Sequence, residues 1–214
     1  MRITELFYSI QGEGRHSGIP TTFVRTTGCH LRCSWCDAEY TFTGGETKTI
    51  DEVMEFVQAQ PTKNVCFTGG EPLLQKDAWD LVDRLVAGGY HTLIETAGNM
   101  DFGHANTYAA REQICISMDI KCPSSKMDDQ NTPEKIFDLR APDQLKFVIN
   151  DRIDYDYAKG ILAQFEGRIP CPVFFNPVGG VEPKQLTEWV MEDGLRVHVG
   201  IQIHKLMWGD VPGV

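Results

Sequence analysis

The stretch that most restricts the fold and function of this chain is CHLRCSWCD, residues 29–37, which holds three cysteines in the spacing C-x3-C-x2-C. Thiolates are natural ligands of zinc and of iron–sulfur clusters, and three within eight positions can converge on one centre. Structural zinc motifs favour paired C-x2-C units, and the sequence holds no second pair. The spacing therefore favours a cluster with one open iron, with a zinc knuckle completed by His30 or Cys66 as the alternative.

The overall composition is that of an ordinary globular protein. The chain has 214 residues, 42% of them hydrophobic, which predicts a single domain over residues 1–214. It shows no apolar run of membrane-spanning length and no secretory leader, so the expected location is cytoplasmic. A net charge of −10 argues against a nucleic-acid-binding surface. Cys66, Cys115 and Cys171 lie among apolar residues and are expected in the core.

Short apolar runs alternate with amphipathic segments, which is the signature of β/α units. The predicted strands are 21–26, 65–68, 91–95, 114–120, 145–150, 173–176 and 197–204. The predicted helices are 48–58, which opens with a Thr49–Glu52 capping box, then 78–86, 134–139, 155–165 and 183–191. A doubly wound sheet and a barrel both suit this order. Because 214 residues are few for eight β/α units, a shortened or open barrel is favoured.

The unusual segments of the sequence each follow or close a predicted strand. They are CHLRCSWCD, GGEP at 69–72, ETAG at 95–98, SMDIK at 117–121 and FFNP at 174–177. Because the C-terminal ends of barrel strands carry the active site, we expect one site built from all five. Residues 124–133, SSKMDDQNTP, form a polar loop that is predicted to be the most mobile segment.

An open iron can bind a small molecule that a fully ligated iron cannot. The amino and carboxylate groups of S-adenosylmethionine can chelate it, and one electron from a [4Fe-4S] cluster can then cleave the S–C5′ bond to give a hydrogen-abstracting radical. In its cysteine spacing, in Trp35 before the third cysteine and in GGEP, the chain resembles the radical S-adenosylmethionine (radical SAM) enzymes. The resemblance implies an α/β fold of the radical SAM type, a shortened, open TIM-like (β/α) partial barrel with about six core parallel strands.

The N-terminal segment narrows the resemblance. FYSIQGEG at 7–14, the Gly18-Ile19-Pro20 turn and Arg25 before the first cysteine resemble the 7-carboxy-7-deazaguanine synthase family, and the similarity covers nearly the whole chain. The family converts 6-carboxy-5,6,7,8-tetrahydropterin to 7-carboxy-7-deazaguanine with loss of ammonia, in queuosine and 7-deazapurine biosynthesis. The implied activity is a carbon–nitrogen lyase. The alternatives are another radical SAM protein, such as a glycyl-radical activating enzyme, or a non-catalytic zinc or iron–sulfur module.

The resemblance also implies roles for individual residues. Cys29, Cys33 and Cys36 are expected to hold the [4Fe-4S] cluster. The expected contacts of S-adenosylmethionine are Trp35, Cys36, Asp37, Gly70, Glu71, Gly98, Ser117, Lys121 and Asn176. The expected contacts of the pterin substrate are Ile10, Gln11, Gly12, Glu13, Arg25, Thr96 and His204, with Lys205 as a secondary candidate. No general base is assigned.

Side-chain chemistry agrees with several of these roles. Glu71 can accept the ammonium group of the cofactor, and Glu13 and the Gln11 carbonyl suit the N–H donors of the pterin edge. Arg25 can bind the substrate carboxylate in a bidentate manner, and a surface ion pair is the alternative for this residue. His204 is equally compatible with a packed histidine at a strand end.

Magnesium is the point at which the sequence departs from the family. The family is expected to use a Ser or Thr hydroxyl two residues after the third cysteine, and Ala38 at this position has no ligating atom. Asp37 or Glu39 would have to serve instead, so weaker or absent Mg²⁺ dependence is predicted. As partners the resemblance implies an electron donor such as a flavodoxin or ferredoxin and a second copy in a homodimer, without direct binding of nucleic acid or membrane.

Overall fold

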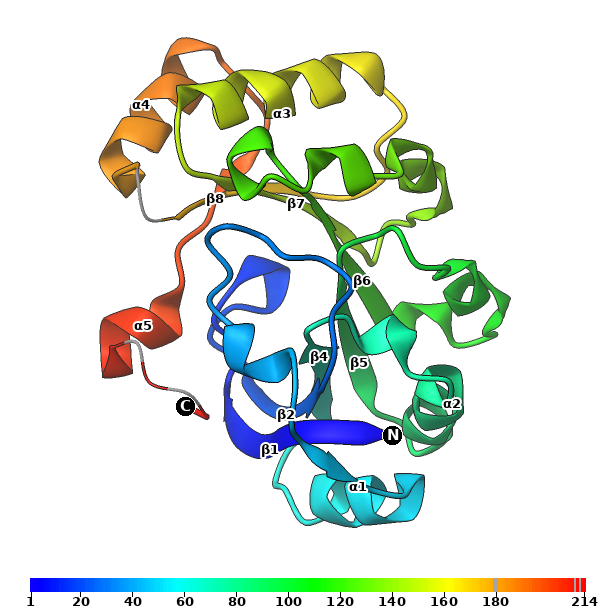
Figure 1. The fold of residues 1–214 in the computed structure, drawn as a ribbon. Coiled ribbons are helices and arrows are strands. Elements are labelled where there is room, and N and C mark those ends of the chain that lie inside the picture. Colours follow the sequence, from blue (N-terminus) through cyan, green and yellow to red (C-terminus); the bar gives the residue numbers. More distant parts are fainter. Residues whose placement is uncertain (179–180, 210, 212) are drawn as a thin grey trace.

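One mixed sheet forms the framework of the protein. The computed structural model describes residues 1–178, 181–209, 211 and 213–214. Within them the strands follow the order β3-β1-β2-β4-β5-β6-β7-β8-β9 (Figure 1). The strands are β1 (Arg2–Ile10), β2 (Pro20–Thr26), β3 (Glu46–Thr47), β4 (Asn64–Gly69), β5 (His91–Thr96), β6 (Ile114–Ile120), β7 (Gln144–Ile149), β8 (Val173–Pro177) and β9 (His198–Val199).

Parallel pairing begins at β2 and continues to the far edge of the sheet. Six successive strands, β2, β4, β5, β6, β7 and β8, are parallel, and the two-residue β9 extends them. At the other edge β1 and β3 are antiparallel additions. Over the described residues the edge strands β3 and β9 do not pair with each other, so the sheet stays open. The predicted open partial barrel with about six core parallel strands is confirmed.

Helices lie between most of the parallel strands and pack apolar side chains against the sheet. They are α1 (Ile50–Gln58), α2 (Ala78–Ala87), α3 (Arg152–Gln164), α4 (Pro183–Glu192) and α5 (Ile203–Trp208). The predicted capping box is confirmed at α1, where Thr49 and Glu52 each accept a hydrogen bond from the other's backbone N–H. Figure 1 shows α1 and α2 beside β4 and β5, and α3 and α4 beside β7 and β8. No helix in the described part of the chain is long and apolar enough to cross a membrane.

The C-terminal segment differs from the prediction. Only His198–Val199 of the predicted strand 197–204 pairs in the sheet, and the chain then turns into α5. The alternation V-H-V-G-I-Q-I-H has the period of a strand, but Gly200 lies so close to Asn176 that a Cβ there would be 2.3 Å from Asn176 Oδ1. The ladder therefore ends at this contact, and α5 extends toward the N-terminal segment (Figure 1).

Further elements also differ from the prediction, among them the short edge strand β3. The segment 134–139 forms a 3-10 helix, Pro133–Asp138, in place of an α-helix, because it is too short to complete two α-helical turns. The strand β1 was not predicted, since the segment RITELFYSI mixes polar and apolar side chains without clear alternation. Pairing with the antiparallel strand β2 stabilises β1, although the sequence pattern of β1 does not indicate a strand. The core placement predicted for Cys66 and Cys115 is confirmed, and Cys171 is half-buried against the core.

Candidate active site

A cavity of about 240 Å³ lies at the C-terminal ends of the parallel strands. All five of the strand-end segments contribute to its lining, as does the QGEG turn after β1. We name its two sides by their sequence motifs. The cysteine wall comprises Cys29, Cys33, Trp35, Cys36, Gly70 and Lys121, and the QGEG wall comprises Gln11, Gly12, Glu13, Arg25, Gln202 and His204.

The cysteine loop begins where β2 ends. Gly28 has a φ of +101°, a conformation that glycine adopts without strain, and its carbonyl oxygen accepts the N–H of Glu71 at 2.9 Å. A Cβ on Gly70 would lie 2.4 Å from this carbonyl oxygen and 2.7 Å from the Cβ of Cys29. The glycines of GGEP therefore allow that backbone to lie directly against the first cysteine.

The thiols of Cys29, Cys33 and Cys36 are half-buried on the cavity lining. Desolvation raises the pKa of each thiol, and the other two thiols act in the same direction on Cys33. Among the described residues, no three His, Cys, Asp or Glu side chains are placed to share one metal ion. Cys66, an expected fourth zinc ligand, is fully buried beside Gln11. The donor set thus fits an iron–sulfur cluster, whose several irons hold thiolates apart, better than a zinc knuckle.

A second loop holds the cysteine loop in place. Ser34 N–H donates to the carbonyl of Ser125, and Trp35 Nε1 donates to Ser124 Oγ, each at 3.0 Å. The buried carboxylate of Asp154, in the first turn of α3, accepts from Ser124 N–H at 2.8 Å and from its hydroxyl. The polar loop that was predicted to be mobile therefore supports the cysteine loop through its first two residues.

Glu71 and Gly98, two expected cofactor contacts, do not line the cavity. The Glu71 side chain is fully buried, and its carboxylate accepts from Thr96 Oγ1 at 2.9 Å, Ala97 N–H at 2.8 Å and Leu73 N–H at 3.1 Å. Burial raises the pKa of this carboxyl group. In this structure Glu71 therefore connects two strand-end turns, and its contact with a cofactor ammonium stays a prediction.

Gly98 lies behind the cavity against β6. It has a φ of +76°, and a Cβ there would lie 2.6 Å from Met118 Cγ. The turn and its packing therefore require glycine here, and the expected contact of Gly98 with the cofactor stays a prediction. The other expected contacts that line the cavity are Ile10, Asp37, Thr96, Ser117 and Asn176.

Glu13 is the centre of the QGEG wall. Its carboxylate accepts from Lys146 Nζ at 3.1 Å, Asn176 Nδ2 at 2.9 Å and Gln202 Nε2 at 2.6 Å. Burial alone would raise the pKa of this carboxyl group, but Lys146 and Gln202 hold it below its ordinary value. Glu13 is therefore ionised at neutral pH and can act only as a hydrogen-bond acceptor.

Gly12 and His204 join α5 to the QGEG turn. A Cβ on Gly12 would lie 1.8 Å from His204 Nδ1, so only glycine allows the imidazole to lie over this backbone. Ile203 N–H donates to the Gly12 carbonyl at 3.0 Å, which holds α5 against the same turn. Burial lowers the pKa of His204, which favours the neutral imidazole. This packing was one of the two expectations for His204, and the residue also lines the cavity.

Arg25 lies at the edge of the QGEG wall. Its Nε donates to Glu5 Oε1 at 2.6 Å, and its guanidinium carbon is 5.8 Å from the centre of the Phe7 ring. Burial would lower the pKa of the guanidinium, but Tyr40 and Glu5 raise it. The ion pair that was the alternative expectation for Arg25 is therefore present. The Arg25 side chain also lines the cavity.

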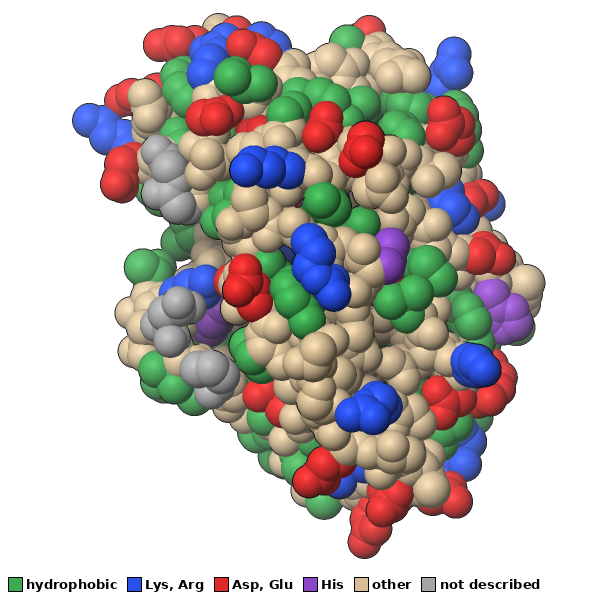
Figure 2. All heavy atoms as spheres, in the orientation of Figure 1, with side chains coloured by type: hydrophobic (Ala, Val, Ile, Leu, Met, Phe, Trp, Pro, Cys, Tyr) green, Lys and Arg blue, Asp and Glu red, His purple; other side chains and the backbone are tan. Residues whose placement is uncertain are grey.

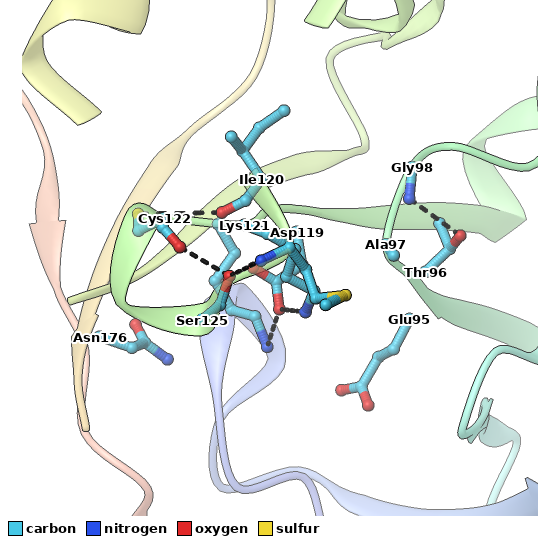
Figure 3. Close-up of polar contacts among 12 residues, drawn as sticks. Glu95, Thr96, Ala97, Gly98, Asp119, Ile120, Lys121, Cys122, Ser125 and Asn176 are labelled. Atoms are coloured by element: carbon cyan, nitrogen blue, oxygen red, sulfur yellow. Dashed lines mark hydrogen bonds and ion pairs between the residues drawn. The ribbon is translucent and has the colours of Figure 1, made fainter. Parts of the chain in front are cut away.

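Three charged cavity residues were not assigned from the sequence, namely Glu95, Asp119 and Lys146. Asp119 Oδ2 pairs with Lys121 Nζ at 2.8 Å, and these two side chains lie side by side in Figure 3. Lys146 lies opposite Asp119 in the β6–β7 register, with its Nζ 3.8 Å from Asp119 Oδ2. The sequence could have indicated all three residues, because each lies in a buried parallel strand. Burial of a charged side chain there costs free energy unless the charge is paired or functional.

The described residues around Ala38 do not fit a magnesium site. Asp37 lines the cavity, but its Oδ2 accepts from Gln202 Nε2 at 3.3 Å and from Lys205 Nζ at 3.5 Å. The side chain of Glu39 is exposed outside the cavity lining. Magnesium needs several oxygen ligands, but the Asp37 carboxylate is already bound by the Lys205 ammonium.

Residues 23–180 of the chain match the family model of the Radical SAM superfamily. The chain is 40% identical over 215 residues to the 7-carboxy-7-deazaguanine synthase of Thermoplasma acidophilum, with both chains covered completely. It is also 40% identical over 224 residues to the 7-carboxy-7-deazaguanine synthase of Koribacter versatilis, with 97% of each chain covered.

Two solved structures share the fold. The crystal structure of QueE from Escherichia coli matches with a TM-score of 0.74 at 20% identity, covering 94% of this chain and 93% of that chain. Streptococcus suis SuiB bound to S-adenosylmethionine matches with a TM-score of 0.64 at 12% identity, covering 84% of this chain and 49% of that chain. At these identities the similarity concerns the arrangement of strands and helices.

Proposed function

This chain belongs to the Radical SAM superfamily and, within it, to the 7-carboxy-7-deazaguanine synthase family, and from this premise we propose its function. It converts 6-carboxy-5,6,7,8-tetrahydropterin to 7-carboxy-7-deazaguanine and ammonia, in the biosynthesis of queuosine and related 7-deazapurines. The observation that carries the proposal is that the cysteine triad and the QGEG turn line one cavity. A cluster-bound cofactor and a heterocycle held at the turn would therefore be neighbours.

The cysteine wall is the side that suits the cofactor. Cys29, Cys33 and Cys36 would hold a [4Fe-4S] cluster, which with bound S-adenosylmethionine would supply a radical able to remove a hydrogen atom from the pterin. The Gly70 backbone lies against Cys29, where no side chain separates it from the cofactor. Further cofactor contacts are expected from Trp35, Asp37, Ser117, Lys121 and Asn176, which all line the cavity.

The QGEG wall is the side that suits the pterin. The ionised Glu13 accepts hydrogen bonds from ring and amino N–H groups, and the His204 imidazole covers the Gly12 backbone beside it. Arg25 lines the cavity, and we expect its guanidinium to bind the substrate carboxylate. Ile10, Gln11 and Thr96 complete this set.

The expected partners follow from the chemistry and from the family. The reaction needs a one-electron donor for the cluster, for which a flavodoxin or ferredoxin is expected, and a homodimer and a cytoplasmic location are expected from the family. On the face drawn in Figure 2, Lys and Arg side chains are interspersed with Asp and Glu. This distribution supports the expectation that the protein acts on a small molecule and does not bind nucleic acid directly.

The proposed function is tested by anaerobic reconstitution. The protein is supplied with iron and sulfide, reduced in the presence of S-adenosylmethionine and incubated with 6-carboxy-5,6,7,8-tetrahydropterin. We expect the absorption and electron paramagnetic resonance of a [4Fe-4S] cluster, and stoichiometric formation of 7-carboxy-7-deazaguanine and ammonia. Tight zinc binding without a cluster, or an intact cluster that cleaves S-adenosylmethionine without forming this product, would contradict the proposal.

A further inference from the structure

Four carboxylates line the cavity, and three of them have a lysine within ion-pair distance. The three pairs are Glu13 with Lys146 at 3.1 Å, Asp37 with Lys205 at 3.5 Å and Asp119 with Lys121 at 2.8 Å. The fourth carboxylate is Glu95, which over the part of the chain that the structure describes has no cation within ion-pair distance, although the charges of Arg25 and Lys146 act on it from further away. A carboxylate bound directly by an ammonium has fewer free acceptor sites, so Glu95 differs from the others in what it can bind.

The Glu95 carboxylate is oriented by neutral donors. Gln11 Nε2 donates to Oε1 at 3.0 Å, and Thr68 Oγ1 donates to Oε2 at 2.8 Å. The buried Cys66 thiol also hydrogen-bonds to this carboxylate. With about four lone-pair sites on its two oxygens, the carboxylate keeps capacity for a further donor. Figure 3 shows the side chain projecting from the end of β5 away from Thr96 and Gly98.

Glu95 also lies between the two walls. One of its donors, Gln11, belongs to the QGEG wall, and the other, Thr68, directly precedes the glycines that lie against Cys29. Gln11, Thr68 and Glu95 line the same cavity as the three cysteines, so the carboxylate is available to a molecule bound there. A pterin bound by its N–H edge at the QGEG turn would extend toward the cysteine loop. Glu95 can then contact the part of the pterin ring between that edge and the reacting carbon.

The loss of ammonia needs such a group. After the ring has contracted, a C–H proton must leave, its electron pair must form the new ring double bond, and the C–N bond must break with its electrons passing to nitrogen. The leaving nitrogen must then gain a proton to depart as ammonia. A single carboxylate can accept the first proton and return it to the nitrogen, and it ends in its original state.

We propose that Glu95 is the acid–base residue of this elimination, an inference that rests on the proposed function. Its carboxylate accepts the C–H proton of the contracted ring and delivers it to the departing nitrogen. Gln11 and Thr68 hold the carboxylate in position for both transfers. His204 is another cavity side chain that can accept a proton, and its imidazole lies over the Gly12 backbone.

The decisive variant is Glu95→Gln, which keeps the size of the side chain and removes its proton-transfer capacity. We expect kcat to fall by about 100-fold or more, the usual size of an acid–base contribution, with KM for the carboxypterin changed less than about threefold. The acidic limb of the kcat profile should disappear. Deuterium at C6 of the substrate should still appear in 5′-deoxyadenosine, because hydrogen abstraction precedes the step that Glu95 serves.

Three comparisons complete the experiment. Thr68→Val keeps the carboxylate and removes one of its donors, so kcat should fall less than tenfold with the acidic limb displaced. Glu95→Asp keeps an acid and should retain an acidic limb even if the Gln variant assembles no cluster. Asp51→Asn removes an exposed carboxylate on α1 and should leave turnover unchanged.

The outcomes separate this inference from the proposed function. Wild-type protein that makes no 7-carboxy-7-deazaguanine overturns both. Normal product formation by the wild type together with a Glu95→Gln kcat within threefold of it overturns the acid–base role alone. The role is also overturned if Glu95→Gln or a cluster-loaded Glu95→Asp raises KM without changing the pH profile of kcat, or if His204→Gln alone removes the acidic limb.

Discussion

The two walls of the cavity are positioned by different forces. The cysteine wall rests largely on backbone groups and neutral side chains, such as Ser34 with Ser125 and the close approach of Gly70 to Cys29. The QGEG wall rests on charge, because Glu13 is bound by Lys146, which lies 133 residues further along the chain. A wall positioned by backbone contacts should tolerate the loss of a supporting side chain, whereas a wall positioned by one buried ion pair should not.

Removal of a cluster ligand is the largest expected effect and tests what the cysteine wall is for. Cys33→Ala should bind little iron after reconstitution and should form no product, because two thiolates cannot hold a cluster in place of three. Iron content and electron paramagnetic resonance measure this directly. Cys171→Ser is the matched control, since Cys171 is half-buried away from the cavity, and it should assemble a normal cluster. A Cys33→Ala protein with a full cluster and normal turnover would remove the residue from the ligand set.

Removal of the Glu13 partner tests whether charge positions the QGEG wall. Lys146→Met should raise the dissociation constant for the carboxypterin by about 10–100-fold, the equivalent of one charge-assisted hydrogen bond. S-adenosylmethionine cleavage without substrate should be retained. Lys146→Arg keeps the charge and should lose less affinity. Equal binding by the wild type and Lys146→Met would show that the backbone also positions this wall.

The same variant changes the pH dependence of binding. In the wild type, Lys146 and Gln202 hold the pKa of Glu13 below its ordinary 4.5, so the carboxylate stays ionised and affinity should be constant down to about pH 5. Without the lysine, burial raises this pKa, and Glu13 becomes protonated as the pH falls toward the new value. Lys146→Met should therefore lose affinity between about pH 7 and pH 5, measured relative to Lys146→Arg.

The two walls also differ in how well the sequence predicts them. Cys29, Cys33 and Cys36 lie within eight residues, so the sequence alone indicates a shared cluster site. The apolar period of the β/α units likewise predicts the parallel sheet. Lys146 gives a weaker signal, because its partner Glu13 lies on a distant turn and no local pattern joins them. The segment that carries Gln202 was read as a strand from its alternation, and only its tertiary contacts make it a turn and a helix.

Glu71 shows the limit of a motif even in the cysteine wall. The letters GGEP predict a turn beside the cysteines, and this turn is present, but the Glu71 carboxylate is bound by Thr96 and Ala97. Glu71→Gln places an amide among these donors and should lower the free energy of unfolding by about 1–3 kcal/mol. The melting temperature of the chain should fall by about 2–10 °C, while the affinity for S-adenosylmethionine changes less than about threefold. A large loss of cofactor affinity at unchanged stability would restore Glu71 as a ligand contact.

The smallest expected effect concerns magnesium, and it asks whether a cation of the protein can occupy the place of a metal. Ala38 offers no ligand, and Asp37 is already bound by Gln202 and Lys205 at the junction of the two walls. A hydrated Mg²⁺ would have to displace that ammonium to gain one carboxylate oxygen, which is a poor exchange for an ion that demands octahedral coordination. Turnover after chelation should therefore change less than about twofold on addition of Mg²⁺. Ala38→Thr restores a hydroxyl at this position. A saturable Mg²⁺ response that appears only in this variant would show that alanine at position 38 removes the site. A sharp Mg²⁺ requirement in the wild type would contradict the prediction and show that Asp37 exchanges its lysine for the metal.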